Sequence, residues 1–175
     1  MTKPRRIARW VAVAFVLVLV AGLLIPETVS IPVQGATSAD WNEDSFWYEP
    51  WGASGVHKGI DIFGERGQPV VAATGGMVLY RGEVSRGGLI VVVLGPKWRI
   101  HYYAHLDTID ESAGSYVGRG DVLGTVGDTG NAAGKQPHLH YTILALLPHP
   151  WHFSSGTQGW KRMFYLDPTV RFNSE

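Results

Sequence analysis

"GLIVVVLGPKWRIHYYAHL", residues 88–106, is the stretch that decides the fold class of this chain. Two runs of β-branched, aliphatic and aromatic residues flank Gly95 and Pro96, a pattern typical of two strands joined by a turn. Similar short runs punctuated by glycine recur on both sides: PVVAA (69–73), GMVLYRG (76–82), DVLGTVG (121–127) and HLHYTILALL (138–147). Because no amphipathic helix of ordinary length lies between them, we predict an all-β (mostly β) domain of antiparallel sheets in a flattened, barrel-like arrangement.

The size and composition of the chain limit what the domain can contain. Its 175 residues, 45% of them hydrophobic, suffice for one domain with a core and an additional segment. The sequence contains no cysteine. A disulfide is therefore excluded, and any metal site must use histidine and carboxylate ligands rather than thiolates.

The amino-terminal segment carries a targeting signal. Four basic residues precede the apolar run from Trp10 to Ile25, a pattern typical of an export signal or a membrane anchor. The run reaches only about 24 Å as a helix, short of the roughly 30 Å of a bilayer core. A cleaved signal peptide remains an alternative, but "TVS" (28–30) is only a passable cleavage site. We expect residues 1–26 to be an uncleaved anchor preceding an extracytoplasmic domain in the cell envelope, on the periplasmic side or outer face of the cytoplasmic membrane.

The rest of the chain indicates the domain boundaries and excludes one class of partner. Residues 27–44 are polar and small, which predicts a linker, and we expect the folded domain over residues 45–175. Beyond the anchor, eleven basic residues stand against fifteen acidic ones. A nucleic-acid partner is disfavoured, because phosphate binding requires a basic patch.

Two histidines lie two positions apart in "QPHLHYTI", residues 136–143. On a strand, His138 and His140 leave the same face, with Cβ atoms roughly 6 to 7 Å apart. That separation suits one metal ligand and one neighbour in the same cavity. Strand geometry alone does not say which histidine would be the ligand.

A second candidate pair occurs in "VHKGIDI", residues 56–62. His57 and Asp61 are about 13 Å apart on a straight strand, so a bend at Gly59 is needed to bring both to one ion. Two imidazoles and one carboxylate could hold a divalent metal and leave a position for water, as in catalytic zinc sites. The alternative is that these are ordinary polar residues of a β domain.

Four separated stretches, taken in order, resemble one known family: HKGIDI (57–62), GQPVVAATGGMVLYRG (67–82), YYAHLD (102–107) and VGRGDVLGTVGDTGNAAGKQPHLHY (117–141). The chain resembles the lysostaphin-type zinc peptidases, or LytM-domain murein endopeptidases, over roughly residues 55–144. The resemblance implies antiparallel sheets with a groove and one zinc ion (Zn2+) per chain. It also implies hydrolysis of cross-links or stem peptides of bacterial peptidoglycan, with metal-activated water as the nucleophile.

The same resemblance implies roles for five residues. His57, Asp61 and His140 would be the metal ligands, and His105 and His138 the unligated catalytic pair. The expected partners are therefore peptidoglycan peptides and, through the amino-terminal segment, a membrane; the sequence indicates no protein partner.

The sequence departs from the family pattern around the His-x-His motif, residues 138–140. Lys135 and Gln136 are inserted before His-x-His, and the glutamate often found after the following aromatic residue is missing. Tyr48 is only a candidate for a tyrosine that stabilises the transition state. Two alternatives come from other classes: a non-catalytic LytM-type regulator of another wall hydrolase, whose known silent members have lost ligands, and a non-haem iron oxygenase, which usually spaces its first ligands as His-x-Asp.

Overall fold

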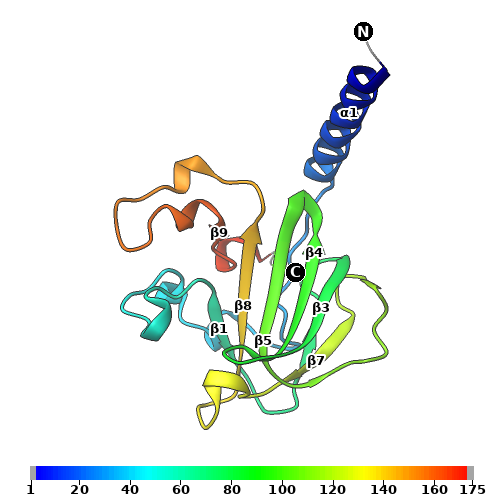
Figure 1. The fold of residues 1–175 in the computed structure, drawn as a ribbon. Coiled ribbons are helices and arrows are strands. Elements are labelled where there is room, and N and C mark those ends of the chain that lie inside the picture. The colour runs from blue at the N-terminus through cyan, green and yellow to red at the C-terminus, as the bar shows by residue number, and fades with distance from the viewer. Residues whose placement is uncertain (1–2, 173–175) are drawn as a thin grey trace.

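The computed structural model describes residues 3–172 and consists of one apolar helix attached to a β domain (Figure 1). Helix α1 is Lys3–Leu24. The strands are β1 (Ile60–Phe63), β2 (Pro69–Val71), β3 (Gly76–Val84), β4 (Gly88–Gly95), β5 (Arg99–Ile109), β6 (Tyr116–Val117), β7 (Val122–Val126), β8 (His138–Ala145) and β9 (Tyr165–Leu166).

After α1, all helical segments in the described part of the chain are 3-10 turns of three residues. They are η1 (Ser38–Asp40), η2 (Glu43–Ser45), η3 (Gly52–Ser54), η4 (Pro96–Trp98), η5 (Gly130–Ala132), η6 (Pro150–His152), η7 (Lys161–Met163) and η8 (Thr169–Arg171). The predicted mostly β class is therefore confirmed.

The nine strands belong to one antiparallel sheet that does not close into a barrel. Its main path runs β1-β8-β5-β4-β3-β6, with β9 added beside β8, and β7 pairs with both β5 and β2. The stretch that decides the fold forms β4 and β5, which pair with each other across η4. The side chains on the inner face form one core: Tyr103, Tyr141, Ile60, Ile62, Leu106, Leu123, Leu139, Ile143 and Leu166.

The segment between α1 and the domain differs from the expected linker, because part of it is packed into the core. Val29 and Val33 are only 3% and 1% exposed, and isolated bridges join Val29 to Phe172 and Val33 to Val70. The reason is a short alternation of apolar residues at 29, 31 and 33, which is the period of a strand. The neighbouring proline and polar residues hide this pattern in the sequence.

A buried ionic cluster also ties this segment to the sheet. Glu27 pairs with Arg99, and its Oε1 lies 3.4 Å from His101 Nε2; we call these three residues the Glu27 cluster. Their side chains are 3%, 9% and 0% exposed. Glu27 follows α1 by only three residues, so the helix end is connected to the domain by a buried charge pair rather than by a free tether.

Candidate metal centre

The candidate site is built where β1 and β8 lie side by side. Asp61 of β1 is directly opposite His140 of β8 in the antiparallel register. His57 precedes β1, which begins only at Ile60, so the predicted departure from a straight strand is present. At Gly59 an added Cβ would lie 2.4 Å from the Tyr141 carbonyl oxygen and 3.1 Å from His140 Cε1. Glycine is therefore required for the close approach of this segment to β8.

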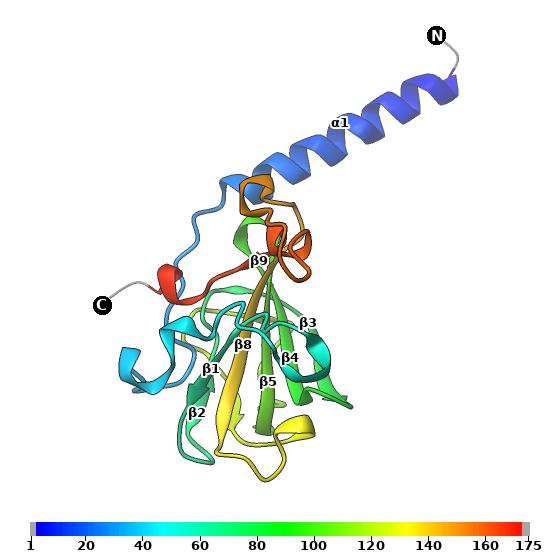
Figure 2. The same cartoon turned by 90° about the vertical axis from the view of Figure 1, so that its left-hand side faces the viewer.

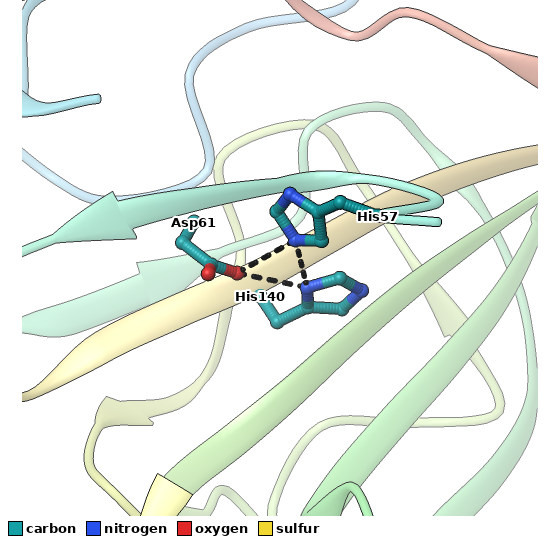
Figure 3. A group of neighbouring side chains, drawn as sticks. All are labelled: His57, Asp61 and His140. Carbon is teal, nitrogen blue, oxygen red and sulfur yellow. Dashed lines mark hydrogen bonds and ion pairs between the residues drawn. The ribbon is translucent and has the colours of Figure 1, made fainter. Parts of the chain in front are cut away.

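Three ligand-type atoms converge at this point (Figure 3). Asp61 Oδ1 lies 3.1 Å from His57 Nε2 and 2.8 Å from His140 Nδ1, and the two nitrogens are 3.1 Å apart. Donors around a tetrahedral zinc ion, each at about 2.1 Å, are roughly 3.4 Å from one another. His57, Asp61 and His140, here called the His57 group, are thus arranged as one face of a metal site.

The other ring nitrogens of the His57 group are held by fixed partners. His57 Nδ1 lies 2.9 Å from the Ser45 carbonyl oxygen, which can only accept, so this nitrogen donates and Nε2 keeps its lone pair. His140 Nε2 lies 3.1 Å from Thr142 Oγ1, which can accept its proton and leave Nδ1 free. Metal-binding histidines characteristically donate their second nitrogen in this way.

Burial and hydrogen bonding set the protonation of the His57 group. Burial alone would raise the pKa of Asp61, but its hydrogen bonds to His140 and His57 outweigh this and lower the pKa far below the usual range of a carboxyl group. Burial also lowers the pKa of His140. An ionised carboxylate beside a neutral imidazole is the protonation state that a divalent cation requires.

Two further histidines line the same pocket as the His57 group. The rings of His105 and His138 meet edge to face with centroids 5.1 Å apart, and His105 is 6.0 Å from the His140 ring. The Nδ1 atoms of His105 and His138 donate to the carbonyl oxygens of Thr129 and Gln136. Each ring therefore presents Nε2 to the pocket as a proton acceptor.

The orientation of His105 results from a break in strand β5. His101 and Tyr103 point into the core, and regular alternation would send His105 there as well. Instead His105 has a φ of 65°, in the left-handed region that non-glycine residues rarely adopt, while its N–H donates to the Gly87 carbonyl oxygen at 2.8 Å. This conformation turns the imidazole into the pocket. Burial lowers the pKa of His105 to about 4.

The pocket around these five residues has an aromatic wall and a basic rim. Trp51 stacks on His57 with centroids 4.0 Å apart and an interplanar angle of 19°. Other lining residues include Lys58, Arg86, Tyr102, Asn131 and Lys135. Tyr48, the candidate transition-state tyrosine, is 53% exposed and does not line the pocket, whereas Tyr102 does.

The structure brings all five predicted site residues into one pocket: His57, Asp61, His105, His138 and His140. It also shows contacts that the sequence did not predict. Thr142 contacts His140 Nε2, and its i, i+2 spacing from His140 on one strand was a usable signal. The stacking of Trp51 on His57 joins a loop to the site and had no such signal. His101 is a buried strand residue, while His149 and His152 lie in the β8–β9 loop outside the pocket.

The fold and the site define a class: an antiparallel β protein with a His-Asp-His group and a flanking histidine pair in one pocket. The family model for peptidase family M23 matches residues 55–148, and the chain belongs to this family. Peptidases of this family are zinc-dependent.

Curated relatives include proteins of two kinds. The chain is 36% identical over 105 residues to the murein hydrolase activator NlpD of Salmonella dublin, covering 59% of this chain and 27% of NlpD. It is 35% identical over 111 residues to the L-Ala–D-Glu endopeptidase of Bacillus subtilis, covering 58% of this chain and 34% of that protein. The matched part thus spans about a third or less of these relatives.

Among solved structures, the catalytic domain of lysostaphin from Staphylococcus simulans matches with a TM-score of 0.55 and 27% identity, covering 69% of this chain and 83% of that domain. This similarity agrees with the family assignment and with the resemblance predicted from the four sequence stretches.

Proposed function

We propose that this protein is a zinc endopeptidase that hydrolyses peptide cross-links or stem peptides of bacterial peptidoglycan. The observation that carries the proposal is the convergence of His57 Nε2, Asp61 Oδ1 and His140 Nδ1, with the Nε2 atoms of His105 and His138 presented to the same pocket. One carboxylate and two neutral imidazoles match the ligand preference of zinc and leave a position for water or substrate.

In this proposal His57, Asp61 and His140 would hold one zinc ion, which when bound would supply a water of lowered pKa and a Lewis acid for the scissile carbonyl group. His105 and His138 handle the proton. Each can accept a proton at Nε2 and return it to the leaving amine, because Nδ1 of each is already committed to a backbone carbonyl. Trp51 and the rim residues Lys58, Arg86 and Lys135 position the peptide in the groove.

A non-catalytic regulator of another wall hydrolase is the second candidate, favoured by the similarity to an activator.

Zinc analysis and digestion of purified sacculi by the full chain, with and without a chelator, distinguish the two candidates. If the protein is an enzyme, it should contain one zinc per chain and release muropeptides, and the chelator should abolish this release. Stoichiometric zinc without any release would support the regulator, and well-folded protein with far less than one zinc would contradict the catalytic proposal. The muropeptide profile identifies the bond cleaved.

We further propose that α1 is retained as an anchor and holds the domain outside the cytoplasm. Its length and composition suffice to cross a membrane. Cleavage after Ser30 would remove Glu27 and Val29, leaving Arg99 buried without its partner and a gap in the core. Breaking a buried ion pair in this way is strongly destabilising. Because Val29 and Val33 belong to the core, we place the start of the folded unit near Glu27 rather than at residue 45.

A further inference from the structure

The last turns of α1 are in direct contact with the β4–β5 connection, η4. Trp98 Nε1 donates to the Leu19 carbonyl oxygen at 2.8 Å, and Lys97 Nζ donates to the Leu23 carbonyl oxygen at 3.3 Å. A Cβ at Gly22 would lie 2.3 Å from the Trp98 ring, so the indole lies against the bare helix backbone. The η4 end of the domain is therefore fixed beside helix residues 19–23, while the rest of α1 projects away from the domain (Figures 1 and 2).

This contact determines the depth of Trp98 if α1 spans a bilayer. The helix residues beside it are all apolar, and the membrane-type segment Arg5–Leu24 has no buried share in the structure. A side chain at the level of Leu19 to Leu23 then lies in the layer between hydrocarbon and headgroups. Tryptophan is enriched in that layer because its ring is apolar and its N–H is polar.

The β8–β9 loop lies at the same end of the domain. Its first residue, Leu146, donates its N–H to the Trp98 carbonyl oxygen at 2.9 Å. Figures 1 and 2 both place this loop at the end of the domain where α1 ends, and Figure 1 shows it extending away from the helix. Leu146, Trp151 and Phe153 are 48%, 75% and 60% exposed. Large apolar side chains gathered on one surface indicate an interaction site rather than ordinary exposure.

Charge distinguishes this end from the rest of the domain. No aspartate or glutamate occurs from Val84 to Leu106, which includes η4, or from His138 to Leu166, which includes the whole loop. Lys97 lies in η4, and Arg162 lies in η7 at the end of the loop. An acid-free surface with basic residues is attracted to anionic headgroups rather than repelled by them.

We propose that Trp98, Leu146, Trp151 and Phe153 form a membrane-contacting rim that sits in the interfacial layer of a bilayer containing anionic lipid. This inference rests on the proposed anchor and adds a second contact that fixes the tilt of the domain. His140 and Leu146 are six residues apart along β8 and its continuation, about 20 Å in an extended chain. The rim therefore keeps the candidate site at most roughly 20 Å from the bilayer, within reach of wall peptides close to the membrane.

The cysteine-free chain allows a direct test by single spin labels. Trp151→Cys and Phe153→Cys would each be labelled with a nitroxide in the full chain, reconstituted into vesicles of neutral and anionic phospholipid. Ala133→Cys, exposed after η5, is the matched control at the other end of the domain. We expect the ratio of accessibility to oxygen over accessibility to a water-soluble nickel chelate to be several-fold higher at 151 and 153 than at 133.

Three outcomes would overturn the proposal in distinguishable ways. If the chain does not float with the vesicles, α1 is not an anchor, and that part of the proposed function fails with it. If the chain floats but the labels at 151 and 153 are as open to nickel as the label at 133, the anchor stands and the rim does not. If the labels at 151 and 153 are shielded from both reagents, another protein surface covers the loop.

Discussion

Two polar clusters lie toward opposite ends of β5 and β8, and they differ in how their charge is balanced. In the Glu27 cluster the carboxylate is paired with a permanently charged guanidinium, and all three side chains are nearly inaccessible. In the His57 group the carboxylate is shared by two imidazoles, and Asp61 and His140 remain 15% and 20% exposed in a pocket. The first cluster is neutral and closed, whereas the second has an open position and a charge that a cation would balance. Similar residue types thus form a closed, packed cluster at one end and an open group suited to a cation at the other.

The largest expected difference is in zinc content and hydrolysis rate, between a variant of His140 in the His57 group and a variant of His101 in the Glu27 cluster. His140→Ala should abolish both zinc binding and hydrolysis, because two protein ligands rarely hold zinc. His101→Gln should retain one zinc per chain, since His101 contacts Tyr141 and Glu27 rather than the pocket. Metal analysis and rates on folded protein check both variants. Retention of zinc by the His140 variant would move the site elsewhere.

The next effect is on stability and comes from the Glu27 cluster. Glu27→Ala leaves Arg99 buried and unpaired, which should lower the free energy of unfolding by about 3 to 5 kcal/mol. Urea unfolding of the full chain in detergent measures this. Glu43→Ala, at an exposed glutamate, is the matched control and should stay within about 0.5 kcal/mol of the parent. Equal midpoints for the two variants would mean that the pair contributes nothing.

Within the pocket, substitution of a proposed catalytic histidine should affect zinc content differently from substitution of the proposed ligand His140. His138→Ala and His105→Ala should each keep zinc nearly stoichiometric while the rate falls roughly a hundredfold, the scale of losing a general acid or base. Paired zinc content and rate provide the measurement. If the His138 variant loses zinc and the His140 variant keeps it, the assignment within residues 138–140 is reversed.

The sequence predicts the strands and the His57 group better than it predicts the orientation of His105 or the Glu27 cluster. The strands around residues 88–106 and the three ligand-type residues follow from local pattern, spacing and resemblance. The direction of His105 does not, because its φ of 65° depends on the contact of β5 with Gly87, far from it in the chain. The packing of Val29 and the pairing of Glu27 with Arg99 were also missed. Both depend on contacts more than forty residues apart in a segment whose composition is typical of a linker.

The smallest expected effect is the pH dependence of the Glu27 cluster. Burial, together with the nearby charges of Arg99 and Arg171, lowers the pKa of His101 to about 3. Glu27 Oε1, 3.4 Å away, would act in the opposite direction, but Arg99 neutralises it, so we expect the lowered value to hold. Below pH ~6.5 His101 is therefore protonated in the unfolded chain but stays neutral in the native state. The free energy of unfolding then falls as the pH falls.

At pH 5 this difference should cost about 2 kcal/mol relative to pH 7.5, at 1.36 kcal/mol per pKa unit. Burial also lowers the pKa of His105 and of His140, so the contribution of His101 is the difference between the stability profiles of the parent and His101→Gln. Glutamine does not titrate and can still hydrogen-bond to the Tyr141 hydroxyl group, which makes the variant a close match. Urea unfolding at intervals between pH 7.5 and pH 5 gives both profiles. Parallel profiles would show that the pKa of His101 is near its usual value in the folded protein, and a parent that gains stability toward pH 5 would show that the charge of Glu27 dominates after all.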